Sequence, residues 1–254
     1  QPVYNKEKDL KKTYTAVYNI SGNTLFQLAD KEIPHLITAD EGNAPIALLS
    51  TNQSYATEQM WEGRSRYDIY TVNLQTGERR QIKKASNSNM QLSPKGTYAY
   101  WYCVQDSSWY TYSLANGKEY RLTTPTTFAA WDEDNDVPDY PSPHGLAGWT
   151  ADDHNLLIYD RYDIWKFDPT AEVAPVNLTV NGRKEQLSYR LIRLDKEEKF
   201  IDITKLQLLQ VFNEKTKGSG YYSAHLSAPK APKALLAGNF MLKTPVKAKY
   251  SDAV

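Results

Sequence analysis

The feature that most constrains the fold of this chain is an internal repeat of short apolar segments and turns. Its clearest copies begin at Asp68 and Ser108, and each runs through alternating apolar residues to a turn that ends in Gly77 or Gly117. Further copies, the last of them weaker, begin at Asp163, Gly220 and Asn23. The apolar residues that close successive copies are 40 to 57 residues apart. Self-similarity at this spacing predicts consecutive structural units of one kind.

The second half of each unit is predicted to be a β-hairpin. Tyr70, Val72 and Leu74 alternate with polar residues, which indicates a strand that buries one face. The turns Gln75–Gly77 and Ala115–Gly117 contain the glycine that a hairpin needs for a positive φ. The same arrangement of strand, turn and strand recurs in the other copies.

A second strand pair precedes each hairpin. Leu92–Tyr102 contains a tight Pro-Lys-Gly turn between two apolar segments, and Trp149–Tyr159 is its counterpart. Leu194–Ile201 is a degraded third version of the same pattern. One unit therefore contains about four antiparallel strands in its 40 to 57 residues, which is the size and content of a β-propeller blade.

We predict an all-β chain made of β-propeller blades of four antiparallel strands, in one propeller region that spans residues 1–254. The expected blades are 1–38 (partial), 39–84, 85–124, 125–180 and 181–238, with 239–254 as the start of the next blade. Strands are expected near 14–20, 24–29, 34–38, 45–51, 67–74, 79–83, 97–104, 108–114, 119–123, 155–160, 163–167, 175–179, 206–212, 220–226 and 234–237. Almost no helix is expected.

Two segments depart from the simple repeat. Ile203–Glu214 is the best helical candidate, but the register of the repeat favours a strand. The segment 124–148 contains four prolines and five acidic residues, so we interpret it as a long loop inserted between blades.

Composition excludes several classes of function. Thirty Lys and Arg residues balance thirty Asp and Glu residues, so no global attraction to nucleic acid or to an anionic membrane is expected. The single cysteine excludes a disulfide framework and a thiolate zinc cluster. No apolar run approaches the length of about 18 residues that a membrane span needs. The chain begins with Gln1 and not with Met, so we take it to be a piece of something longer.

Several runs of residues resemble one family. Ser93–Tyr100 resembles the Ser-Pro-Asp-Gly-Lys turn of the propellers in prolyl oligopeptidase-type serine peptidases and in TolB-like proteins. Gly145–Asp153, followed by Tyr159–Trp165, resembles the propeller portion of large peptidases of this clan from Bacteroidetes, and Phe212–Lys217 is similar to a stretch of the same proteins. The resemblance covers roughly residues 40–254.

The resemblance implies a propeller that precedes an α/β-hydrolase domain with a Gly-x-Ser-x-Gly nucleophile elbow. No such elbow occurs in this sequence, and Gly218-Ser-Gly220 lacks the required spacing. The expected function is therefore non-catalytic: the region gates and positions peptide substrates for the hydrolase domain of the parent protein. A stand-alone TolB-like propeller that acts as a protein-interaction scaffold is the alternative. Whether the chain counts as part of an enzyme stays open.

The resemblance also bears on closure and location. Four to five blades are fewer than the about seven or eight expected of this family, so an incomplete, open propeller is predicted. The parent is expected in the periplasm or outside the cell. Its partners would be its own hydrolase domain and peptides, with no nucleic acid and no membrane span.

The sequence supports no catalytic, cofactor-binding or metal-binding residue and no cofactor. The acidic run Asp132–Asp136 lacks the glycine and glutamate of an EF-hand, so a solvated loop is favoured over an ad hoc metal site. Arg161, in Asp160–Asp163, is interpreted as pairing with neighbouring carboxylates and holding adjacent strands together, with substrate binding as the alternative. Four histidines lack a partner at metal-ligand spacing and an accompanying nucleophile: His35, His144, His154 and His225.

The aromatic residues could form a stacking platform for carbohydrate or nucleic acid. Their recurrence at equivalent repeat positions favours packing between blades instead. The set comprises Trp101, Tyr102, Trp109, Tyr110, Tyr112, Trp149 and Trp165. Cys103 lies among them and is expected to be a buried, inert thiol.

Overall fold

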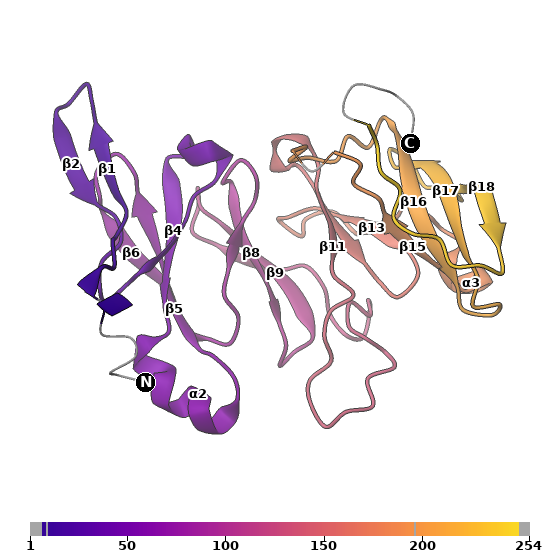
Figure 1. Ribbon diagram of the computed structural model, residues 1–254, viewed down its shortest axis with the longest axis horizontal. Coiled ribbons are helices and arrows are strands. Elements are labelled where there is room, and N and C mark those ends of the chain that lie inside the picture. The colour runs from indigo at the N-terminus through magenta and orange to yellow at the C-terminus, as the bar shows by residue number, and fades with distance from the viewer. Residues whose placement is uncertain (1–6, 9, 196, 249–254) are drawn as a thin grey trace. The chain divides into compact units, whose positions relative to one another are not determined.

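The computed structural model describes residues 7–8, 10–195 and 197–248, and the regular secondary structure of these residues consists mainly of antiparallel strands (Figure 1). Two compact units make up the chain, Gln1–Ala99 and Tyr100–Val254. No helix in the described part of the chain is long and apolar enough to cross a membrane.

The first unit contains a hairpin and a four-stranded sheet. The hairpin joins β1 (Ala16–Asn19) to β2 (Thr24–Gln27). The sheet has the order β3-β4-β5-β6, and its strands are β3 (His35–Ile37), β4 (Ile46–Thr51), β5 (Tyr67–Asn73) and β6 (Arg79–Ser86).

Three further sheets follow along the chain, each with four strands in chain order. The first comprises β7 (Gln91–Leu92), β8 (Tyr98–Cys103), β9 (Ser108–Ser113) and β10 (Glu119–Arg121). The second comprises β11 (Leu146–Trp149), β12 (Leu156–Tyr159), β13 (Ile164–Phe167) and β14 (Val176–Asn177). The third comprises β15 (Leu187–Leu191), β16 (Leu206–Asn213), β17 (Ser219–His225) and β18 (Lys233–Gly238).

A four-stranded antiparallel meander repeated along a chain is the architecture of β-propeller blades, so the predicted fold class is confirmed. The repeat extends to individual hydrogen bonds. In two sheets the closing threonine accepts a bond from the third strand: Trp109 N–H donates to Thr123 Oγ1 at 2.9 Å, and Ile164 N–H donates to Thr179 Oγ1 at 3.1 Å.

The turn between the first and second strands is also repeated. Tyr98 N–H donates to Ser93 Oγ at 2.9 Å, and Asn155 N–H donates to Thr150 Oγ1 at 3.0 Å. In both turns the backbone N–H of the hydroxyl residue bonds back across the turn at 2.9 Å. A hydroxyl side chain therefore closes the turn in both sheets, which confirms that the two segments are counterparts.

Apolar side chains from alternating positions form the cores. In the first unit Tyr70 of β5 and Leu74, which directly follows β5, pack against the cluster that contains buried Val72, as the period-two pattern predicts. In the second unit the largest described cluster joins the sheet β11–β14 to the sheet β15–β18 through Leu157, Tyr189 and other buried residues. The aromatic set is confirmed as packing residues, since Trp101, Tyr102, Trp109, Tyr112 and Trp149 are buried and Tyr110 and Trp165 are partly buried.

The prediction that the strand near 34–38 closes the first blade is wrong, because β3 pairs with β4 and opens the next sheet. The cause is a tight turn after β2. The Asp30 carboxylate accepts bonds from Glu32 N–H and Ile33 N–H, and Asp30 N–H donates to Ile33 O. This Asx-type turn redirects the chain into a new sheet.

The structure differs from the prediction at several places between the expected strands. The helix α2 (Ala56–Glu62) lies in the β4–β5 connection, where no apolar period marks it, because the helix is exposed throughout. The short helix α3 (Gly182–Glu185) precedes β15, a strand that was not predicted. The expected strand pair around Leu194–Ile201 is instead a long connection between β15 and β16.

Other expectations fall partly outside the described residues. Residues 1–6 and 9 belong to the first expected blade, Lys196 to the fifth, and 249–254 to the expected next blade. Residues 239–248 form no strand. The candidate Ile203–Glu214 is a strand over Leu206–Asn213, as the repeat register predicts.

The segment 124–148 is irregular up to β11, and its base is packed. Phe128 is buried, and its ring makes edge contacts with Trp165 at 5.3 Å and with Phe167 at 5.1 Å. An isolated antiparallel bridge joins Trp131 to Pro143. Residues 134–140, beyond this bridge, are exposed. The base of the loop is thus packed against the sheet, and its tip is exposed to solvent.

Candidate functional site

Charged side chains gather at one end of the sheet β11–β14, around the turn Asp160–Asp163. Arg161 and Tyr162 lie in this β12–β13 turn, and Arg183 lies in α3, which follows β14. The Tyr162 ring is 8% exposed, with the Arg161 guanidinium 5.3 Å and the Arg183 guanidinium 5.1 Å from its centroid. Two guanidinium groups therefore lie within cation–π distance of one aromatic ring.

Two carboxylates of the inserted loop bind these two cations. Asp134 binds Arg161 through both carboxylate oxygens, with Nη1–Oδ1 and Nη2–Oδ2 distances of 2.6 Å. Glu133 binds Arg183 in the same way, with Nη1–Oε1 and Nη2–Oε2 distances of 3.2 and 3.0 Å. Side-by-side pairing of this kind is the strong, directional form of the arginine–carboxylate contact.

Backbone donors hold the turn that carries Arg161. The Asp160 carboxylate accepts bonds from Tyr162 N–H at 2.7 Å and Asp163 N–H at 2.5 Å, and its other oxygen accepts one from Trp165 Nε1 at 3.2 Å. Asp160 is 4% exposed, and this burial raises the pKa of its carboxyl against the opposing effect of the backbone hydrogen bonds.

The position of Arg183 depends on buried Asp163. Its carboxylate accepts bonds from Thr179 Oγ1 at 2.6 Å, Gly182 N–H at 2.9 Å and Arg183 N–H at 3.1 Å. Gly182 is required here, since a Cβ at that position would meet the Asp163 carboxylate at 2.7 Å. One buried carboxylate thus connects the β12–β13 turn to α3.

A third arginine and a histidine complete the cluster. The Arg190 guanidinium lies 4.6 Å from the centroid of the Tyr159 ring and donates to the carbonyl oxygens of Asp160 and Arg161. Burial lowers the pKa of Arg190. Burial, followed by the charge of Arg190, also lowers the pKa of His144, whose Nε2 atom is buried without a hydrogen-bond partner among the described residues.

The sequence anticipated only part of this cluster. Arg161 pairs with carboxylates as interpreted, but they come from the inserted loop, and from Glu214 at 4.0 Å, and not from adjacent residues. Arg183 and Arg190 were missed, because nothing in their spacing marks residues that meet only after the sheets have packed. In the acidic run Asp132–Asp136, Glu133 and Asp134 pair with arginines. The described part of the chain contains no group of three His, Cys, Asp or Glu side chains that could hold a metal ion.

The remaining candidates lie apart from this turn in the sequence. His35 is in β3, His154 follows a short 3-10 helix, and His225 ends β17, with its Nδ1 atom 3.0 Å from Thr204 O. Cys103 is half-buried and not fully buried as expected, and burial raises the pKa of its thiol. A thiol with a raised pKa is a poor nucleophile at neutral pH.

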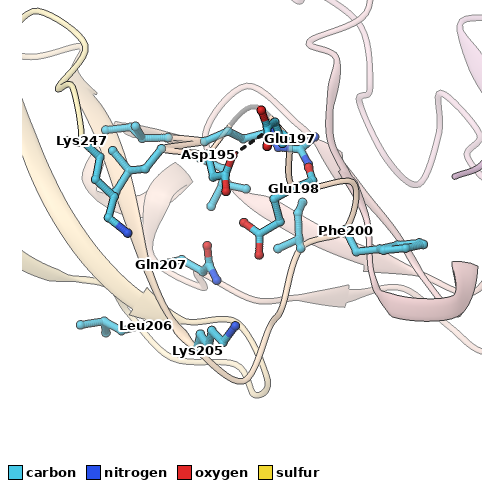
Figure 2. Close-up of a pocket in the computed structure, with 13 residues that line it drawn as sticks. Asp195, Glu197, Glu198, Phe200, Lys205, Leu206, Gln207 and Lys247 are labelled. Carbon is cyan, nitrogen blue, oxygen red and sulfur yellow. Dashed lines mark hydrogen bonds between the residues drawn. The ribbon is translucent and has the colours of Figure 1, made fainter. Parts of the chain in front are cut away.

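A separate hollow of about 570 Å³ lies where the β15–β16 connection meets the start of β16 (Figure 2). Its lining carries both signs of charge, with Asp195, Glu197 and Glu198 on one side and Lys205 and Lys247 on others. The three acidic residues are exposed, and Glu197 N–H donates to Asp195 Oδ1 at 2.9 Å. Exposed charges of mixed sign in a wide hollow do not define one ligand chemistry.

Comparison with known proteins returns structural similarity only. No family model matches this chain, and no curated protein matches it. A putative TolB from Agrobacterium tumefaciens is 12% identical with a TM-score of 0.43, over 87% of this chain and 73% of that protein. TolB from Acinetobacter baumannii is 13% identical with a TM-score of 0.36, over 88% of this chain and 52% of that protein. A prolyl endopeptidase is 9% identical with a TM-score of 0.43, over 92% of this chain and 33% of that enzyme.

Proposed function

We propose that this chain is the non-catalytic propeller region of a serine peptidase of the prolyl oligopeptidase type, where it gates and positions peptide substrates. The observation that carries the proposal is the position of the runs that resemble this family. Ser93–Tyr100 forms a hydroxyl-closed blade turn. Gly145–Asp153 contains β11 and most of the turn after it, and Tyr159–Trp165 runs from the last residue of β12 through the β12–β13 turn to the start of β13.

The role follows from what such blades can and cannot do. Acyl transfer needs a serine on an elbow, a general base and an oxyanion hole in mutual register, and the sequence has no Gly-x-Ser-x-Gly motif. A propeller beside a hydrolase pocket can admit extended peptides, exclude folded proteins by size and keep bulk water from the site. The partners in this proposal are a hydrolase domain and peptides, in the periplasm or outside the cell.

The test is an activity measurement on purified 1–254. We expect no hydrolysis of Ala-Pro or Gly-Pro chromogenic peptides and no reaction with a fluorophosphonate probe. Stoichiometric labelling of any serine by that probe would overturn the non-catalytic assignment.

The coding sequence that follows Val254 separates this proposal from the TolB-like scaffold. A Gly-x-Ser-x-Gly elbow a few hundred codons downstream supports the peptidase, and a stop codon near Val254 supports the scaffold. Where an elbow is found, peptidase activity of the longer protein should fall when the propeller region is removed, or lose its discrimination against folded substrates.

A further inference from the structure

Arg161 and Arg183 each place a guanidinium group over the Tyr162 ring, 5.3 and 5.1 Å from its centroid. We call these three residues the arginine clamp. The planar guanidinium groups each offer a fork of donors that matches the two oxygens of a carboxylate. The Arg161 and Arg183 side chains are 24% and 52% exposed while they are paired with the inserted loop.

The clamp is supported by residues that do not belong to the inserted loop. Arg183 lies 3.7 Å from buried Asp160, and Arg161 lies 4.0 Å from Glu214 in the β16–β17 turn. The stacking on Tyr162 and the backbone hydrogen bonds of Asp163 are likewise independent of residues 132–143. We therefore expect the two guanidinium groups to keep their places when the loop carboxylates leave.

The present occupants are two consecutive acidic residues, Glu133 and Asp134. Asp134 is exposed even while paired, with 66% of its side chain in contact with solvent. The Glu133 side chain is 26% exposed. Ion pairs at a surface typically contribute about 0–1 kcal/mol each, and the two-point geometry places these two pairs at the upper end of that range. The loop is thus held to the clamp by contacts that another acidic chain can replace at modest cost.

We propose that the arginine clamp is a binding site for an acidic peptide segment with two neighbouring carboxylates, and that Glu133 and Asp134 occupy it in cis as a competing ligand. A tethered ligand competes at an effective concentration on the order of millimolar. The wild-type chain should therefore bind an external acidic peptide weakly, and removing the two loop charges should expose the site. This proposal does not depend on an association with a peptidase.

The test uses the full chain and a fluorescein-labelled peptide with the sequence of residues 130–137, Ala-Trp-Asp-Glu-Asp-Asn-Asp-Val. Its partner peptide has Gln and Asn in place of the Glu and the Asp that follows it. Fluorescence anisotropy should show that the variant Glu133→Gln/Asp134→Asn binds the acidic peptide roughly tenfold or more tightly than wild type. It should also prefer the acidic peptide to the Gln-Asn peptide. Adding Arg183→Gln should remove the gain.

A charge-matched control is available in the same loop. Asp136→Asn/Asp139→Asn removes two negative charges from exposed positions away from the clamp pairs and should leave peptide affinity at the wild-type level. Circular dichroism establishes that each variant is folded. The proposal is overturned if the folded Glu133→Gln/Asp134→Asn variant gains no affinity, binds both peptides equally, or gains no more than the control.

Discussion

At the scale of single residues, buried hydroxyl groups form hydrogen bonds that apolar side chains of the same shape could not form. Thr179 is fully buried, accepts a bond from Ile164 N–H and donates to Asp163 Oδ1. It thereby satisfies a backbone donor and one oxygen of the carboxylate that positions Arg183. Buried polar groups that lose such partners are costly, because water does not replace them.

The variant Thr179→Val should lower the free energy of unfolding by about 1–3 kcal/mol, because two buried groups lose a partner while the volume is kept. Chemical denaturation followed by tryptophan fluorescence measures this change. Thr24→Val, at an exposed position of β2, is the matched control and should have little effect. Equal losses in the two variants would contradict the role assigned to Thr179.

His144 makes stability depend on pH. Burial and the nearby charges of Arg190 and Arg161 lower the pKa of His144 in the folded state, and Asp132 and Glu133 oppose them. Below the ordinary histidine pKa of about 6.5, the unfolded chain therefore binds more protons than the folded chain at this residue. The stability that neutral His144 contributes is therefore fully present above the ordinary histidine pKa, and it is lost as the pH falls below that value toward the lowered pKa of the folded state.

We expect His144→Gln to reduce the loss of unfolding free energy between about pH 7.5 and about pH 5.5. Wild type must be measured at the same pH values, because Asp160 also titrates. The raised pKa of its carboxyl makes the folded chain bind more protons at Asp160 than the unfolded chain does, so its contribution to stability rises as the pH falls. Urea denaturation at several pH values measures the free energy of unfolding of both proteins. Parallel pH profiles for the two proteins would rule out His144 as the titrating group.

At the scale of elements, the β7–β8 turn depends on a glycine for two separate reasons. Gly96 has φ +73°, and an added Cβ would lie 2.8 Å from the Cβ of Ala44 and 3.1 Å from that of Ala39. Gly63, which ends α2, has φ +66° but nothing within 4 Å of an added Cβ. The two positions share the backbone requirement and differ in the steric one.

Gly96→Ala should therefore destabilise the chain more than Gly63→Ala. The strained backbone alone costs about 1 kcal/mol or somewhat more at each position, and the contact with Ala44 adds to it at Gly96. Thermal unfolding of both variants provides the measurement. A smaller loss for Gly96→Ala than for Gly63→Ala would show that the turn moves away from its neighbours without cost.

The inserted loop should separate into a dispensable tip and an essential base. Replacing residues 132–142 by an Asn-Gly turn keeps Trp131 and Pro143 of the base bridge and removes the two ion pairs of the loop, which contribute up to about 1 kcal/mol each, so the fold should persist. Phe128→Ala should instead cost about 3 kcal/mol or more, because it empties a buried aromatic contact with Trp165 and Phe167. Denaturation midpoints compare the two variants. A larger loss from the replacement than from Phe128→Ala would place the tip in the core.

At the scale of the whole molecule, four repeated sheets imply a repeated pattern of backbone protection. The second and third strands of each sheet are hydrogen-bonded on both sides, whereas the first and fourth have one hydrogen-bonded neighbour in their sheet. Amide exchange should therefore show four maxima of protection along the chain, at β4–β5, β8–β9, β12–β13 and β16–β17. Hydrogen exchange followed by mass spectrometry tests this, and strongest protection in 56–62 or 132–140 would contradict it.

The sequence by itself determined the blade, because each blade is built from local information. The alternation at Tyr70, Val72 and Leu74 and the turns that end in Gly77 and Gly117 act within a few residues of one another. Such signals can be recognised along the chain before anything is packed. The all-β class, the period of the repeat and the packing role of the aromatic residues followed from them, while the open propeller inferred from the blade count stays a prediction.

Tertiary structure alone decided where one sheet ends and the next begins, and which charges meet. An Asx-type turn at Asp30 moved the strand His35–Ile37 into the next sheet, and β15 was missed because its partner lies beyond a long connection. The arginine clamp joins a β-turn and a short helix, and its carboxylates come from a loop 27 and 50 residues away along the chain. Contacts at such separations leave no period in a sequence, since they depend on how the sheets and loops pack and not on neighbouring residues.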